Sequence, residues 1–113
     1  MFGFHQPSVP EVEAEKVFED INSQKDIIIL DVRTPQELLR GKISESINVP
    51  VDEIEEQAER VAPDKNKTTY VYCLSGSRSG VAVGQMIKMG YKNVFSMTSG
   101  ILAWRAKNYP MTM

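Results

Sequence analysis

The 113-residue sequence is poor in cysteine and histidine, with a single residue of each. A lone cysteine excludes a disulfide within the chain, a cysteine-based metal cluster and any mechanism that needs a second thiol from the same chain. The one histidine, His5, has no ligand cluster near it, so we expect a packing or surface role. These absences predict a protein of a reducing compartment that needs no metal and no other cofactor.

Long apolar runs and an excess of basic charge are also missing. The apolar stretches are far too short to cross a bilayer, and Met1–His5 lacks the basic and apolar regions of a signal peptide. We therefore expect a cytoplasmic protein that does not bind membranes. The formal net charge of −2 and the isoelectric point near 5.4 provide no field for nucleic acid, although a local cradle can still hold a small anion.

What is present is the composition of one soluble globular domain. Hydrophobic residues make up 42% of the chain and charged residues 25%, and the length suits one compact domain rather than two. The first seven residues show no periodicity and predict a lead-in, in which Phe2 and Phe4 could cover core. One edge-strand pairing is expected near Ser8 and Val9.

Apolar periodicity predicts that strands and helices alternate along the chain. Ser8 and Glu11 have the spacing of a capping box, and Ala14 begins an apolar helical face that continues to Ile21. Ile27–Leu30 does not alternate, which is typical of a strand buried on both faces at the centre of a sheet. The further strands are expected at 47–49, 68–72 and 94–97, and the further helices at 34–40, 52–61, 79–89 and 100–104.

Short connections between these segments predict a parallel α/β sheet with helices on both faces. The later helices are expected to turn their apolar residues toward the core: Ile54, Ala58, Val61, Val83, Met86, Ile87 and Trp104. Asp31 and Arg33 follow the second strand, and we interpret them as polar groups that fasten neighbouring loops. One option is an ion pair between Arg33 and Glu37.

The loop after the fourth strand carries the reactive residue types. Cys73 lies where a buried strand ends and a helix begins, which is where ligands gather in α/β folds. The residues between Cys73 and Arg78 are largely small, hydroxylic or flexible, so several N–H groups can turn toward one point. Such a cradle, a helix N-terminus and Arg78 would favour the thiolate of Cys73. The alternative is a packing cysteine, which would not need a loop with so little apolar surface.

This loop resembles the active-site loop of the single-domain rhodaneses, Cys-x-Ser-Gly-x-Arg-Ser, and the matching residues are Cys73, Ser75, Gly76, Arg78 and Ser79. Leu30–Glu37 resembles the Asp-Val-Arg segment of that family, and Ile47–Pro50 resembles the strand that follows it. Gly100 with Ala103 and Trp104 resembles the closing Gly-Gly-to-Trp motif.

The resemblance covers about residues 8 to 105, with two departures from the family pattern. Lys42 stands where the family usually has histidine, and Ser99 replaces the first glycine of the closing pair.

The resemblance implies a rhodanese-like domain over residues 8–108, with a C-terminal tail over 109–113. Its expected fold is a five-stranded parallel sheet in the order 1-5-4-2-3. The expected activity is transfer of the outer sulfur of thiosulfate, or of another persulfide donor, to Cys73 as a persulfide. The sulfur then passes to cyanide, a thiol or a sulfur-acceptor protein.

The resemblance also assigns roles in the loop, whose substrate-binding and persulfide-stabilising residues are expected to be Leu74, Ser75, Gly76, Ser77, Arg78 and Ser79. Their N–H groups would stabilise the persulfide anion. Arg78 would orient the anionic donor, and Ser75 and Ser77 would add hydroxyl hydrogen bonds.

Other functions are distinguished by the spacing in the loop. Cysteine phosphatases and arsenate reductases place five residues between cysteine and arginine, whereas four separate Cys73 from Arg78. Tyr72 also replaces the histidine of many such phosphatases, and the loop lacks the Cys-Gly-x-Gly-x-Thr pattern of mercaptopyruvate sulfurtransferases. A persulfide carrier that exchanges sulfur only with proteins stays open. An inactive regulatory domain is disfavoured because the cysteine is present.

Overall fold

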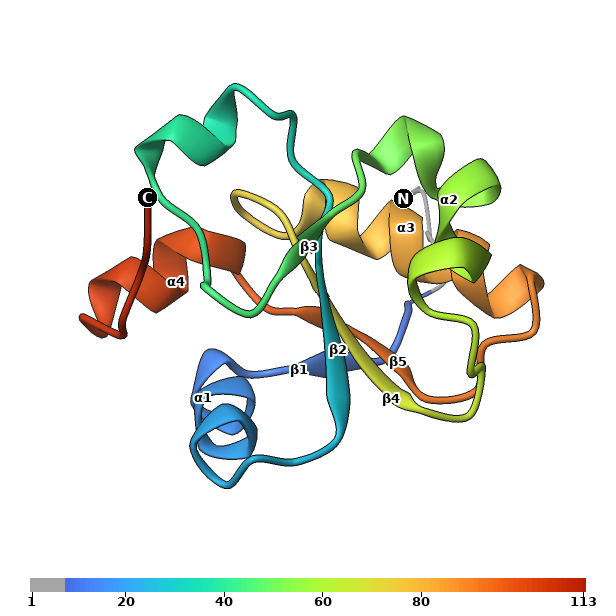
Figure 1. Ribbon diagram of the computed structural model, residues 1–113, viewed down its shortest axis with the longest axis horizontal. Coiled ribbons are helices and arrows are strands. Elements are labelled where there is room, and N and C mark those ends of the chain that lie inside the picture. The colour runs from blue at the N-terminus through green and yellow to red at the C-terminus, as the bar shows by residue number, and fades with distance from the viewer. Residues whose placement is uncertain (1–7) are drawn as a thin grey trace, which may run out of the picture.

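A five-stranded parallel sheet forms the centre of the protein (Figure 1). The computed structural model describes residues 8–113, so the expected lead-in with Phe2, Phe4 and His5 lies outside the described residues. The strands are β1 (Glu11–Val12), β2 (Ile27–Asp31), β3 (Ile47–Asn48), β4 (Thr68–Tyr72) and β5 (Val94–Met97). Their order, β1-β5-β4-β2-β3, is the order that the rhodanese resemblance implied.

The central strand is β4, not β2. The expectation that residues 27–30 form the centre of the sheet is therefore wrong, because the short strand β3 is all that separates β2 from the sheet edge. All five residues of β2 pair with β4, from Ile27 with Thr68 to Asp31 with Tyr72. This register brings the ends of β2 and β4 to the same edge of the sheet.

Helices cover both faces of the sheet, as Figure 1 shows. Two of them, α1 (Ala14–Asn22) and α4 (Gly100–Ala106), contact each other on one face. The opposite face carries α2 (Ile54–Val61) and α3 (Ser77–Lys88), which also contact each other. Two short 3-10 helices, η1 (Glu37–Arg40) and η2 (Val51–Glu53), complete the loops that follow β2 and β3. Between residues 8 and 113, no helix is both long and apolar enough to cross a membrane.

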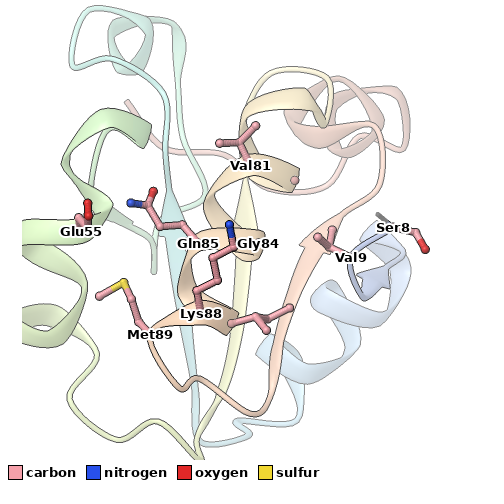
Figure 2. A pocket seen from close by; sticks show the side chains of 10 residues that line it. Ser8, Val9, Glu55, Val81, Gly84, Gln85, Lys88 and Met89 are labelled. Carbon is pink, nitrogen blue, oxygen red and sulfur yellow. The ribbon is translucent and has the colours of Figure 1, made fainter. Parts of the chain in front are cut away.

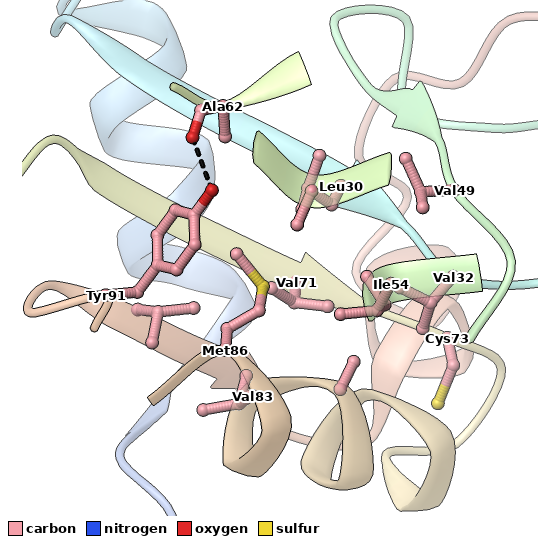
Figure 3. Packing of buried hydrophobic residues seen from close by; sticks show 13 residues of the cluster. Leu30, Val32, Val49, Ile54, Ala62, Val71, Cys73, Val83, Met86 and Tyr91 are labelled. Atoms are coloured by element: carbon pink, nitrogen blue, oxygen red, sulfur yellow. Dashed lines mark hydrogen bonds between the residues drawn. The ribbon is translucent and has the colours of Figure 1, made fainter. Parts of the chain in front are cut away.

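Side chains of each central strand alternate between two cores because successive residues point to opposite faces. Leu30 and Val71 join the core beneath α2 and α3, and Cys73, the residue directly after β4, belongs to the same core (Figure 3). Tyr70 and Tyr72 join the core beneath α1 and α4. Cys73 is therefore anchored on its strand side by the packing of a buried sheet.

Trp104 packs in the core beneath α1 and α4, which confirms the prediction that it faces the core. Its side chain is 1% exposed, and its indole N–H donates to the carbonyl of Pro110 at 2.8 Å. The ring meets Phe18 and Tyr109 edge-on. Further along, Lys42 and Thr112 form an antiparallel bridge, so the last residues pack back onto the domain.

The predicted helix start at Ser8 is wrong. α1 begins at Ala14, with Glu13 as its N-cap, and Glu11–Val12 pairs instead with Ser96 and Met97 of β5. Val9 precedes Pro10, and a residue before a proline disfavours helical geometry. The carbonyl of Pro10 instead accepts the N–H of Ser96 at 2.9 Å. The expected edge pairing near Ser8 and Val9 exists, but three residues further along.

Other boundaries differ by smaller amounts. The expected helix 34–40 is the 3-10 helix η1, preceded by a turn in which Thr34 and Glu37 exchange capping hydrogen bonds at 3.0 and 3.4 Å. The expected helix 52–61 divides into η2 and α2, and strand 47–49 ends at Asn48. α3 begins at Ser77, two residues earlier than predicted. Ile87 was expected in the core, but it is 43% exposed.

Candidate active site

Cys73 follows β4 directly and is 1% exposed. The backbone then reverses through Gly76, whose φ of +117° lies in the left-handed region that residues with a side chain rarely adopt. This turn lets α3 begin at Ser77 and directs its first N–H groups back toward the cysteine. A glycine at position 76 is thus a geometric requirement of the loop.

The sulfur of Cys73 is the centre of a small cradle of donors. The N–H of Gly76 donates to Sγ at 3.1 Å and the N–H of Ser79 at 3.4 Å, while the Ser79 hydroxyl lies 3.6 Å from Sγ. Burial raises the pKa of the thiol, but hydrogen bonds from Ser79, Gly76 and the Ser75 backbone outweigh it. The pKa of Cys73 is therefore lowered, and the loop stabilises a negative sulfur.

Arg78 is held at the rim of the cradle by Glu37. The guanidinium makes two parallel hydrogen bonds to the Glu37 carboxylate, at 2.7 and 2.9 Å. These bonds lower the pKa of Glu37 to about 2. The same hydrogen bonds raise the pKa of Arg78, and the negative charge of Cys73 adds a smaller effect in the same direction. The positive charge therefore acts near the sulfur from a fixed position.

The expected ion pair between Arg33 and Glu37 is wrong, because Glu37 is taken by Arg78 and Arg33 pairs with Asp31. Arg33 and Asp31 are 1% and 0% exposed, and their side chains meet at 2.8 Å. Arg33 also donates to the carbonyl of Gly41 at 2.9 Å, and Asn48 donates to the Asp31 and Arg33 carbonyls. The interpretation of Asp31 and Arg33 as groups that fasten loops is confirmed.

The N-terminus of α4 fixes the first half of the cysteine loop. The N–H groups of Ile101 and Leu102 donate to the carbonyls of Cys73 and Leu74, at 2.9 and 3.2 Å. Gly100 has φ of +55°, and a Cβ built on it would lie 2.5 Å from both carbonyl oxygens. Ser99 also adopts a left-handed conformation, with φ of +60°. The serine that departs from the family pattern therefore forms its left-handed turn at the cost of some strain.

The structure thus brings together some of the expected site residues. Gly76 and Ser79 contact the sulfur, and Arg78 faces Glu37. The side chains of the other three expected site residues are exposed around the loop: Leu74, Ser75 and Ser77.

Sequence reasoning missed two contacts of this site. Glu37 lies 41 positions from Arg78, so no local pattern connects them. Ser96 Oγ lies 2.7 Å from Ser79 Oγ, and its one signal in the sequence is a hydroxyl within an otherwise apolar strand.

A groove of about 850 Å³ runs along the outer side of α3 (Figure 2). Gly80, Gly84 and the exposed residues Val81 and Ile87 contribute to its lining. A neighbouring hollow of about 260 Å³ extends from Gly80 and Val81 to Gly76 and Ser77 of the loop. Cys73 lines neither space, so the groove lies beside the sulfur of Cys73 rather than over it.

Residues 13–107 match the model of the family described as rhodanese-like domain. The chain therefore belongs to the rhodanese-like family.

The relatives support the same assignment. A sulfurtransferase of Allochromatium vinosum is 28% identical over 103 residues, which cover 91% of this chain and 94% of that protein. YrkF of Bacillus subtilis, named as a proposed sulfur carrier protein, is 32% identical over 100 residues. That match covers 88% of this chain, which spans about half of YrkF, 53% of its length.

The fold agrees with solved structures. The crystal structure of a rhodanese-related protein from Thermoplasma volcanium superposes with a TM-score of 0.81 at 34% identity. The superposition covers 91% of this chain and 97% of that one. The chain is a rhodanese-like member of a group that includes sulfurtransferases.

Proposed function

We propose that the protein is a thiosulfate sulfurtransferase in which Cys73 is the nucleophile. The observation that carries this proposal is the cradle of Gly76 and Ser79 N–H groups on Sγ, together with the lowered pKa of a buried thiol. Desolvated thiolate held by fixed donors is a strong nucleophile, and the same donors stabilise a persulfide anion that replaces it.

The reaction then proceeds in two displacements. The thiolate of Cys73 attacks the outer sulfur of thiosulfate, forming the new S–S bond as the old one breaks, and sulfite leaves with the bonding electron pair. Cyanide or a thiolate next attacks the terminal sulfur of the persulfide and regenerates the Cys73 thiolate. Both steps conserve charge and need no other oxidant or reductant.

The loop geometry favours sulfur transfer over phosphoryl chemistry. Gly76 N–H already lies 3.1 Å from Sγ, so the short loop closes on the cysteine itself and suits one added sulfur atom better than a tetrahedral oxyanion. Arg78 would orient the donor from the rim, and the exposed Leu74, Ser75 and Ser77 would contact it as it enters.

A persulfide carrier that is loaded and unloaded by other proteins is the second candidate. The groove along α3 adjoins the hollow that reaches Gly76 and Ser77 of the loop, and Val81 and Ile87 of the groove are 60% and 43% exposed, as expected of a surface for a protein partner. The similarity to YrkF, which is named as a proposed sulfur carrier protein, also favours the carrier. In both candidates the intermediate is the Cys73 persulfide, and the two differ in the donor.

Intact mass measurement after thiosulfate treatment tests the proposal. We expect the parent protein to gain the mass of one sulfur atom and to lose it when cyanide is added. The Cys73→Ser variant should keep the fold but gain no sulfur, because a serine hydroxyl is hardly ionised at neutral pH. A parent protein that gains sulfur only from a protein persulfide would support the carrier. A Cys73→Ser variant that still turns over thiosulfate would refute the role of Cys73.

A further inference from the structure

Ser96 of β5 lies beneath the active-site loop with its hydroxyl against that of Ser79. Ser79 and Ser96 are 0% and 3% exposed, and their Oγ atoms are 2.7 Å apart. Val94 of the same strand points into the core beneath α3, and Phe95 and Met97 point into the opposite core, so the alternation places Ser96 on the α3 side. A polar side chain in this strand thus contacts the helix that carries the cradle.

The neighbours of the two hydroxyl groups determine which one donates. Among residues 8–113, Ser79 Oγ is the one hydrogen-bond partner of the Ser96 side chain. A buried hydroxyl proton needs an acceptor, so the proton of Ser96 points to Ser79 Oγ. Ser79 then cannot donate to Ser96. Its own proton is left with two acceptors, the Gly76 carbonyl at 3.2 Å and, once the thiol has lost its proton, Cys73 Sγ at 3.6 Å.

Of these two acceptors, the sulfur is the one that needs the proton. The Gly76 carbonyl already accepts the N–H of Gly80 at 3.1 Å, whereas an ionised sulfur in a buried site gains strongly from each further donor. A hydroxyl that accepts a hydrogen bond is also a stronger donor, because the bonds of a chain polarise one another. The hydrogen-bond chain therefore runs from Ser96 through Ser79 to Cys73.

We propose that Ser96 is a positioning residue that directs the Ser79 hydroxyl onto the sulfur of Cys73 and thereby stabilises the thiolate and the persulfide. This inference rests on the proposed role of Cys73 as nucleophile, but it concerns the ionisation of the thiol. Thiol ionisation is measured without a sulfur donor, so failure of this inference is distinguishable from failure of the proposed sulfur transfer.

The charged groups around the loop stay unchanged in the test. Arg78 of α3 is paired with Glu37 of η1, and Asp31 at the end of β2 is paired with Arg33. Removal of the Ser96 hydroxyl alters neither pair. A change in the pKa of Cys73 in this variant would therefore report the hydrogen-bond chain rather than a new charge.

The experiment measures the rate of iodoacetamide alkylation of Cys73 against pH in the full chain. Ser96→Ala removes one oxygen and introduces no overlap, so we expect a folded protein whose thiol pKa is raised by roughly half a unit to one unit. Ser79→Ala should raise it further. Ser46→Ala is the matched control. It removes a buried serine hydroxyl that bonds the Ile43 carbonyl and the hydroxyl of Tyr72, whose side chain lies in the core on the other face of the sheet from Cys73, and it should leave the pKa unchanged.

The double variant Ser79→Ala/Ser96→Ala separates positioning from general loosening. If Ser96 acts through Ser79, the double variant has the same thiol pKa as Ser79→Ala alone, because Ser79→Ala already removes the hydroxyl through which Ser96 acts on the sulfur. The proposal is overturned if Ser96→Ala leaves the pKa unchanged, if its shift persists in full in the Ser79→Ala background, or if Ser46→Ala produces an equal shift. Should Ser96→Ala fail to fold, equal pKa values for Ser79→Ala and the parent would overturn it as well.

Discussion

Gly100→Ala is the substitution for which the structure predicts the sharpest effect on the cysteine loop. The new Cβ would lie 2.5 Å from the carbonyl oxygens of both Cys73 and Leu74, where ordinary contacts begin at 3.4 Å. These carbonyls must therefore retreat by about 0.9 Å or α4 must move away. Either movement breaks the hydrogen bonds by which Ile101 and Leu102 hold the loop.

The cost has two parts. Alanine at φ of +55° loses roughly 1–2 kcal/mol relative to glycine, because its Cβ approaches the backbone in the left-handed region. Crowding of a packed site costs about 1–3 kcal/mol more. We expect the free energy of unfolding to fall by about 2–5 kcal/mol in total, with a rise in the pKa of Cys73, since burial persists while the donors to Sγ shift.

Urea unfolding and the pH profile of alkylation measure the two effects. Gly80→Ala is the matched control, because its Cβ meets nothing within 4 Å and position 80 has helical geometry within α3. The control should raise the free energy of unfolding by about 0.5–1 kcal/mol and leave the thiol pKa unchanged. A Gly100→Ala protein with the stability and thiol pKa of the parent would refute the reasoning that α4 fixes the loop.

Two further outcomes concern the ion pairs. Asp31→Ala should lower the free energy of unfolding by about 3–5 kcal/mol in urea, because it leaves the Arg33 charge buried without a partner; a loss below 1 kcal/mol would contradict this. The pKa of Glu37 is lowered from 4.5 to about 2, so its pairing with Arg78 contributes fully to stability above pH 4.5 and is lost as the pH falls through 2. Glu37→Gln should reduce the acid dependence of unfolding in this window, and an identical pH slope in parent and variant would speak against the pair.

Local patterns in the sequence determined the elements and the cradle. Seven consecutive positions, Cys73 to Ser79, contain the nucleophile, the turn glycine and the donors, so backbone geometry alone brings them together. The strands at 68–72 and 94–97 lie where periodicity predicts them, because both buried faces of a parallel strand require continuous apolar or β-branched residues. The predicted helix at 34–40 also ends where expected, since η1 ends at Arg40 and is followed by Gly41, whose φ is +109°.

The sequence was less informative where two local signals competed. Ser8 and Glu11 have capping-box spacing, but the pairing of Glu11–Val12 with β5 draws these residues into the sheet. Ile87 fits the apolar spacing of α3, but its side chain is partly exposed and lines the groove instead of packing in the core. Sheet pairing and packing outweigh helix propensity in such segments, since each local preference is worth only tenths of a kcal/mol to about 1 kcal/mol.

Only the tertiary structure decided which residues support the loop. Glu37 reaches Arg78 across 41 positions, and Ser96 reaches Ser79 across 17, because the parallel crossovers bring η1 and β5 to the N-terminal end of α3. Arg33 could have joined either Asp31 or Glu37 by spacing, and the burial of β2 selects Asp31. Local periodicity encodes the direction in which a side chain points, whereas its distant partner depends on strand order and register.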